Sequence, residues 1–305
     1  TGTTYVNQNT LTLNNPGANG TTFVTIPGDL VLNGGGAVTL AAANQIAQGS
    51  NITINGAGST LTLVGNNTLN GALTFTNPGG TGNPVLAIGT GSLTFGGSIY
   101  ATNDMLGGIV PTISGTFPGY ISMAGTTSIS VGGLGPYGLD IAATAPIFGT
   151  GGIEKTGTGG LRLNATGNAY TGPTTITSGV VFLGAANVIP DFSTFSIGAG
   201  GALDLNGVSE AVSQLSGGGN VTNNSNTAAT LTIGLNNAST SFSGGFIAYS
   251  PAALASVNVT KVGSGALSYT GTSNATGNMI ISGGSIVYSG AAQTAFGTNT
   301  VNTTA

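Results

Sequence analysis

The sequence predicts an all-β parallel β-helix, and three observations support this prediction. Short runs with apolar residues at alternate positions recur along the chain, and Gly and Asn bound many of them. No window has the 3.6-residue period of an amphipathic helix. The spacing of the runs is nearly constant, with starts that step by 19, 22, 21 and 20 residues. This first series comprises Leu11–Leu13, Leu30–Leu32, Ile52–Ile54, Leu73–Phe75 and Leu93–Phe95.

A period of this length, holding two or three short strands, fits one coil of a solenoid. Two further series have similar steps: Val38–Leu40, Leu61–Leu63 and Val85–Ile88; and Leu161–Leu163, Val181–Leu183 and Leu203–Leu205. Propeller blades need about 40–50 residues, and antiparallel sandwiches keep no fixed spacing. We therefore expect residues 1–305 to form a single parallel β-helix with roughly 21 residues per coil.

An Asn directly follows many of these runs. Asn tolerates the left-handed conformation that a tight corner needs, and its amide can bond to an Asn one coil above. The sequence therefore predicts that these residues stack as a ladder. They are Asn14, Asn33, Asn55, Asn164 and Asn206.

The near absence of charge excludes several functions. Only 3% of the residues are charged, and the chain has neither Cys nor His. Catalytic triads that use His, thiolate metal sites and disulfides are therefore excluded. Three basic residues, Lys155, Arg162 and Lys261, are too few to bind nucleic acid through its phosphates. We expect no catalytic residue, no cofactor and no metal site.

Low charge also suits the predicted fold. Equivalent outward residues of successive coils lie about 4.8 Å apart, so a repeated charge would repel its own copy. Thr, Ser and Asn can instead hydrogen-bond along their column. No apolar run is long enough to span a membrane, and no signal peptide is present in these residues. Because the strand pattern is already under way at Thr1 and continues to Ala305, we expect a fragment of a larger surface protein.

Residues 149–190 contain a more specific pattern. A Gly-rich turn precedes Lys155, Gly157, Gly159, Leu161 and Leu163, and Asn168, Tyr170 and Gly172 follow. A looser copy at residues 259–291 aligns Lys261 with Lys155 and Leu267 with Leu161, but lacks the Asn-x-Tyr element. The pattern closely resembles the autotransporter-associated β-strand repeat, also called the passenger-associated transport repeat. The resemblance implies a right-handed parallel β-helix exported to a bacterial surface, in which the repeat serves folding and transport.

Three features of the sequence are candidate sites. Asp191 and Glu210 are spaced for adjacent coils, as the carboxylates of a glycan-cleaving β-helix would be, but isolated acidic residues in turns explain them as well. Residues 132–140, ending at Asp140, are similar to a calcium β-roll unit, but a plain Gly-rich turn is the preferred interpretation. Residues 96–148 concentrate Pro and aromatic residues, which indicates an irregular insertion or, alternatively, a partner-binding or glycan-binding patch around Tyr120.

These observations predict a non-enzymatic structural and adhesive rod, extracellular or at the bacterial cell surface. Self-association through the ends or sides of the rod is expected, because little charge opposes stacking. A glycan or host-surface partner is a further expectation, whereas nucleic acid is not. The alternatives are a carbohydrate-binding or carbohydrate-cleaving β-helix, and the inert stalk of an autotransporter whose active domain is absent.

Overall fold

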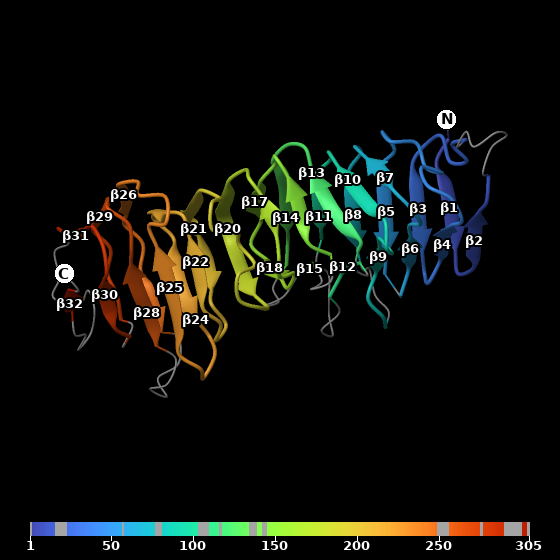
Figure 1. Ribbon diagram of the computed structural model, residues 1–305. Helices are drawn as coiled ribbons and strands as arrows, with labels where there is room; N and C mark the ends of the chain where they lie inside the picture. Colours follow the sequence, from blue (N-terminus) through green and yellow to red (C-terminus); the bar gives the residue numbers. More distant parts are fainter. Residues whose placement is uncertain are drawn as a thin grey trace.

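The computed structural model shows an all-β chain whose strands pair in parallel (Figure 1). It describes residues 2–15, 23–56, 58–76, 81–102, 110–115, 118–133, 139–141, 145–248, 256–274, 277–289 and 301–303. The turns stack into an elongated body with β1 and β2 at one end and β31 and β32 at the other (Figure 1). The predicted parallel β-helix is confirmed.

Each complete turn contributes strands to up to three faces. The first face consists of β1 (Thr4–Asn7), β3 (Leu30–Asn33), β5 (Ile52–Asn55), β8 (Leu73–Thr76), β11 (Ile99–Ala101), β14 (Thr127–Val131), β17 (Ile153–Thr156), the first halves of β20 (Thr174–Leu183) and β21 (Phe195–Asp204), β23 (Ser216–Gly217), β26 (Thr240–Phe242), β29 (Ala266–Tyr269) and β31 (Ser285–Tyr288).

The second face consists of β2 (Thr10–Leu13), β4 (Ala37–Leu40), β6 (Thr60–Thr62), β9 (Val85–Ala87), β12 (Thr112–Ser114), β15 (Leu139–Ile141), β18 (Gly160–Leu163), the second halves of β20 and β21, β24 (Asn220–Asn223) and β27 (Phe246–Ala248).

The third face is divided into two five-stranded sheets. One holds β7 (Asn67–Leu69), β10 (Ser92–Phe95), β13 (Tyr120–Met123), β16 (Ile147–Gly149) and β19 (Ala169–Tyr170). The other holds β22 (Glu210–Val212), β25 (Ala229–Ile233), β28 (Val257–Lys261), β30 (Met279–Ile281) and β32 (Val301–Thr303).

The length of a turn is close to the predicted period of roughly 21 residues, and most turns are longer than that. Along the first face, register partners are 19 residues apart at the shortest step, Tyr269 to Tyr288, and 30 apart at the longest, Ile99 to Ile129. Steps of 21 residues join Lys155 to Ile176 and Ile176 to Ile197. Because the strands stay short, the extra residues lie in the connections between faces.

The longest step lies in the segment 96–148. At its described residues, this segment contributes β11 to β16 to the three faces in the usual order. Its residues 103–109, 116–117, 134–138 and 142–144 lie outside the described residues.

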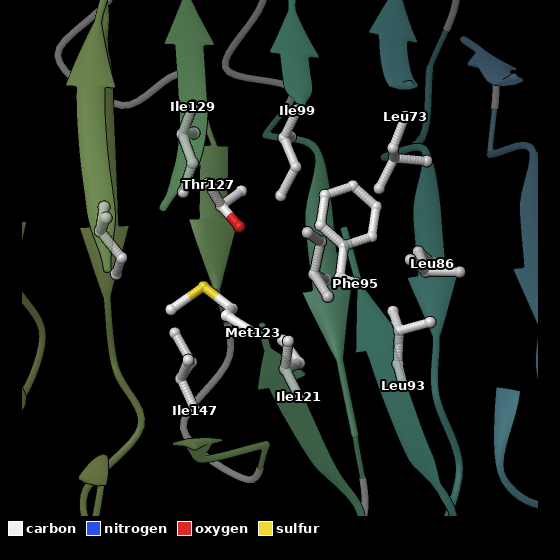
Figure 2. Close-up of a pocket in the computed structure, with 12 residues that line it drawn as sticks. Leu73, Leu86, Leu93, Phe95, Ile99, Ile121, Met123, Thr127, Ile129 and Ile147 are labelled. Atoms are coloured by element: carbon white, nitrogen blue, oxygen red, sulfur yellow. The ribbon is translucent and has the colours of Figure 1, made fainter. Parts of the chain in front are cut away.

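Alternation along the strands places apolar side chains inside the stack. Figure 2 shows Phe95, Met123 and Thr127 among the side chains that surround a small cavity inside the stack, of about 20 Å³. A space of this size holds about one water molecule, so it is a packing defect rather than a ligand site. The buried aliphatic residues, such as Leu32 and Ile54, stack on equivalents in the next turn. The core is therefore a continuous apolar column.

The Asn ladder forms at one corner but does not include all the predicted residues. Asn33 Nδ2 donates to Asn7 Oδ1 at 2.9 Å, and Asn55 Nδ2 donates to Asn33 Oδ1 at 3.0 Å. Thr76 continues the ladder by donating to Asn55 Oδ1. The single ladder predicted for all five Asn residues is therefore wrong.

The other three Asn residues follow strands of the second face, at a different corner. Asn164 and Asn206 are two turns apart, as their spacing predicted, but Gly184 lies between them. Asn206 adopts φ 48° and donates to the carbonyl of Leu183. It therefore satisfies backbone groups of the preceding turn rather than another Asn.

Two lysines lie inside the stack. Lys155 and Lys261 are almost fully buried, and each ammonium group donates to backbone carbonyls at a corner. Lys155 Nζ lies 2.6 Å from Thr156 O, 2.9 Å from Gly157 O and 3.2 Å from Ser178 O. Lys261 contacts Val262 O, Gly263 O and, on the next turn, Gly283 O. The two copies of the Lys-x-Gly pattern therefore build the same corner.

The equivalent corners lie on different faces. Lys155 is the penultimate residue of a strand of the first face, whereas Lys261 ends a strand of the third face. Later turns of the first face have Phe242 and Tyr269 at the register position that Lys155 occupies in its own turn. The pattern thus specifies a corner and is independent of the face on which that corner occurs.

Burial lowers the pKa of Lys155 to about 8 and also lowers that of Lys261. Replacing Lys155 by Met keeps an apolar stem and removes the donor shared by three buried carbonyls. We expect the free energy of unfolding to fall by about 2–4 kcal/mol, because buried acceptors left without a donor are costly. Urea titration followed by circular dichroism measures this loss. Glu154→Gln, which removes a charge from the same strand, should cost less than about 0.5 kcal/mol, and losses of equal size would contradict the account.

Stacked glycines form another corner, beside the third face. A Cβ at Gly151 would lie 2.0 Å from Gly125 O, and a Cβ at Gly172 would lie 2.4 Å from the carbonyl carbon of Gly151. A Cβ at Gly125 would meet nothing within 4 Å. Gly is therefore required at the two later positions because successive backbones approach each other closely there.

These glycines provide a matched pair of substitutions. Gly151→Ala should destabilise the chain by about 1–3 kcal/mol through overpacking, whereas Gly125→Ala should be neutral or stabilising by up to about 1 kcal/mol. Thermal unfolding of the two variants checks the difference. Equal melting temperatures would show that the backbones are further apart than described.

Candidate functional site

The third face is interrupted between β19 and β22, and side chains bridge the interruption. Residues 184–194 form no strand there. Asn168 accepts a hydrogen bond from Ile147 N at 2.7 Å and donates to Val188 O at 2.6 Å. Glu210 Oε2 then accepts from Val188 N at 3.0 Å. An amide and a carboxylate thus replace the missing backbone ladder over three turns.

A buried hydroxyl network lies next to this bridge. The Tyr170 hydroxyl is 2.7 Å from Thr174 Oγ1, which is 3.0 Å from Ser193 Oγ. Ser193 Oγ also donates to Gly172 O at 2.7 Å, and Ser213 Oγ donates to Ser193 O at 2.6 Å. The Asn-x-Tyr-x-Gly pattern is thereby explained, since Asn168 bridges turns, Tyr170 fills the core and Gly172 permits close approach.

Asp191 and Glu210 are brought near each other but do not form a pair of available carboxylates. Glu210 is 2% exposed, and its oxygens accept from Val188 N and Ala211 N. Burial, and to a smaller extent the charge of Asp191, raise the pKa of Glu210 to about 7, although backbone N–H groups oppose the shift. Asp191 is exposed on the neighbouring turn. The arrangement indicates a structural role for Glu210.

The raised pKa of Glu210 predicts a pH-dependent stability. Between its ordinary pKa of 4.5 and about 7, the folded chain binds more protons than the unfolded chain. The free energy of unfolding should therefore fall as pH rises through this interval, by up to about 3 kcal/mol from this group.

Urea titrations at pH 4.5, 6 and 8 measure this slope. Glu210→Gln keeps an acceptor but cannot titrate, so its slope should be flatter than that of the parent chain, whatever its absolute stability. Parallel slopes for the two proteins would contradict the assignment.

An open hollow of about 390 Å³ lies over the interrupted part of the face. Residues 167–171 line one side, and Asn187, Ile189, Pro190, Asp191 and Phe192 line the other. Phe192 is 85% exposed, more than any other large apolar side chain among the described residues. Sequence reasoning selected Asp191 only as a partner for Glu210 and missed Phe192, although an aromatic residue directly after Pro-Asp in a turn was a usable signal.

The aromatic segment contributes a second surface feature. The rings of Tyr120 and Phe148 meet edge to face, with their centroids 5.4 Å apart, and Pro118 and Pro146 flank them in an open groove of about 500 Å³. Tyr100 is also exposed. Phe117 and Tyr137, two further aromatic residues of the segment 96–148, lie outside the described residues.

The predicted Gly-rich turn at residues 132–140 falls largely on residues 134–138, which lie outside the described residues. Within the described ranges, no group of three or more His, Cys, Asp or Glu is placed to hold a metal ion. No helix in the described part of the chain has the length and apolar character needed to cross a membrane.

Comparison with known proteins gives one match. The chain is 35% identical over 162 residues to the adhesin BmaC autotransporter of Brucella suis biovar 1 (strain 1330). The match covers 50% of this chain and 4% of that protein. No protein-family model and no solved structure matches the chain. The similarity therefore relates half of the chain to an autotransporter adhesin, and the repeat type suggested by residues 149–190 stays a prediction.

Proposed function

We propose that the chain is a segment of the passenger of a bacterial autotransporter and acts as a non-enzymatic, adhesive rod at the cell surface. The observation that carries the proposal is the unbroken first face, in which strands from β1 to β31 stack in register over the length of the body. Such a stack extends by adding turns and presents its side chains at fixed spacing. The similarity to an autotransporter adhesin supports the location and the adhesive role.

The state of the acidic residues favours this proposal over carbohydrate cleavage. A glycosidase needs two carboxyl groups that reach the scissile bond from both sides. Glu210 is buried and accepts backbone hydrogen bonds, while Asp191 lies on the surface. The pair that the sequence selected therefore offers one accessible carboxylate, which can bind a ligand but lacks a partner for catalysis.

Surface display tests the proposal. The whole chain, fused to a heterologous outer-membrane translocator, should become accessible to added protease and increase several-fold the number of bacteria retained on cultured epithelial cells. Bacteria that carry the translocator alone provide the baseline. Display without any gain in retention would identify an inert stalk, and release of reducing sugar ends from added polysaccharides would identify an enzyme; either result would overturn the proposal.

Self-association is part of the proposal. With 3% charged residues, the sides of the stack present little repulsion between copies. Electron microscopy of the purified chain should show filaments or laterally paired rods, with an axial repeat of about 4.8 Å if the turns continue from copy to copy. Dispersed single rods at all concentrations would contradict this part of the proposal.

A further inference from the structure

We propose that the hollow between residues 167–171 and 187–192 binds a neutral glycan, with Phe192 as the stacking platform and Asp191 as the principal hydrogen-bond acceptor. The inference deepens the proposed adhesive function, on which it rests, by naming a ligand class and a site. It starts from the most exposed large apolar side chain of the described residues.

The position of Phe192 is fixed by the backbone around it. Ser193 N donates to Pro190 O at 2.9 Å, which closes a tight turn with Asp191 and Phe192 at its tip. Ser193 is itself anchored, since its hydroxyl donates to Gly172 O and its carbonyl accepts from the Ser213 hydroxyl. The exposed Phe192 ring adds no burial energy to the fold. Because the turn already fixes the ring, a ligand that binds there pays a smaller entropic cost.

The other end of the loop is equally fixed. The backbone of Val188 makes two hydrogen bonds to side chains. The Val188 carbonyl accepts from Asn168, and the Val188 N–H donates to Glu210. The hollow therefore lies between two segments that are each tied to the core. Its volume of about 390 Å³ falls within the range of about 300–1,000 Å³ that is typical of small-molecule sites.

Three short polar side chains around the hollow are available to a ligand. Asp191, Asn187 and Thr171 are exposed, and within the described ranges their side chains have no hydrogen bond to another protein group. A carboxylate, an amide and a hydroxyl can accept from and donate to sugar hydroxyls. The ring of Phe192 offers an apolar face for the C–H face of a sugar ring. This combination of one aromatic face with polar groups that donate and accept hydrogen bonds suits a carbohydrate.

The charges around the hollow favour a neutral sugar. Asp191 is the charged residue among those that line it, and neither lysine nor Arg162 lines it. An acidic or sulfated sugar would meet repulsion without a compensating cation. A polypeptide is recognised through an exposed strand edge or a row of apolar pockets, whereas this hollow offers a single ring and short polar groups.

An array of immobilised neutral, sialylated and sulfated glycans, probed with the purified whole chain, tests the inference. We expect binding to neutral glycans, and titration calorimetry with the strongest neutral binder should then give its affinity. Phe192→Ser and Asp191→Ala should each weaken this affinity at least tenfold. Because both side chains are exposed, thermal unfolding and circular dichroism should match those of the parent chain.

Tyr5→Ser is the matched control, since it removes another exposed aromatic ring, from β1 on the first face and many turns from the hollow. It should leave the affinity unchanged. The inference is overturned if no neutral glycan binds, if binding is confined to acidic glycans, or if Phe192→Ser binds as well as the parent chain. Cell retention without glycan binding would overturn this inference alone, whereas glycan binding without cell retention would overturn the adhesive role.

Discussion

The stacking of each turn on the next, about 4.8 Å away, is the constraint on which the other features of this chain depend. Because every outward position is repeated at that spacing, a charged column would repel itself, and the composition avoids this with 3% charged residues. At the corners, the same close spacing brings the backbones of successive turns into contact. At Gly151 and Gly172 the preceding turn lies where a Cβ would be, and at Asn33 and Asn55 the side chains bond from turn to turn. Surface composition and corner residues thus have one physical cause.

The buried lysines show how a side chain inside the stack can donate hydrogen bonds to the backbone carbonyls of a corner. Carbonyls that turn inward at a corner lose their strand partners, and buried acceptors without donors are costly. The flexible stem of Lys155 crosses the apolar interior, and its ammonium group serves carbonyls of its own turn and of the next. Lys261 repeats the arrangement on another face. Charge that would be unfavourable in an outward column is therefore tolerated where several carbonyls share it.

The sequence predicted the parallel strands and a period close to the observed one because alternation and spacing follow directly from burial. Leu30, Ile52 and Leu73 do lie on one face. It did not predict that Asn33 and Asn164 occupy different corners, because the spacing of residues does not define which face a strand joins. The sequence also did not predict that Lys155 lies in the interior, because the pattern around it fits a core position and a turn position equally well. Phe192 was missed because exposure depends on how the loop is held by Ser193 and Val188.

Acylation of amines in the folded chain tests the central claim most directly, because that claim places both lysines inside the stack. Brief treatment with an acetylating ester, followed by mass spectrometry of the peptides, reports each amine separately. We predict that the α-amino group reacts while Lys155 and Lys261 stay unmodified, and that both lysines react once urea unfolds the chain. Modification of either lysine in the folded chain at the rate of the α-amino group would contradict the account of the corners.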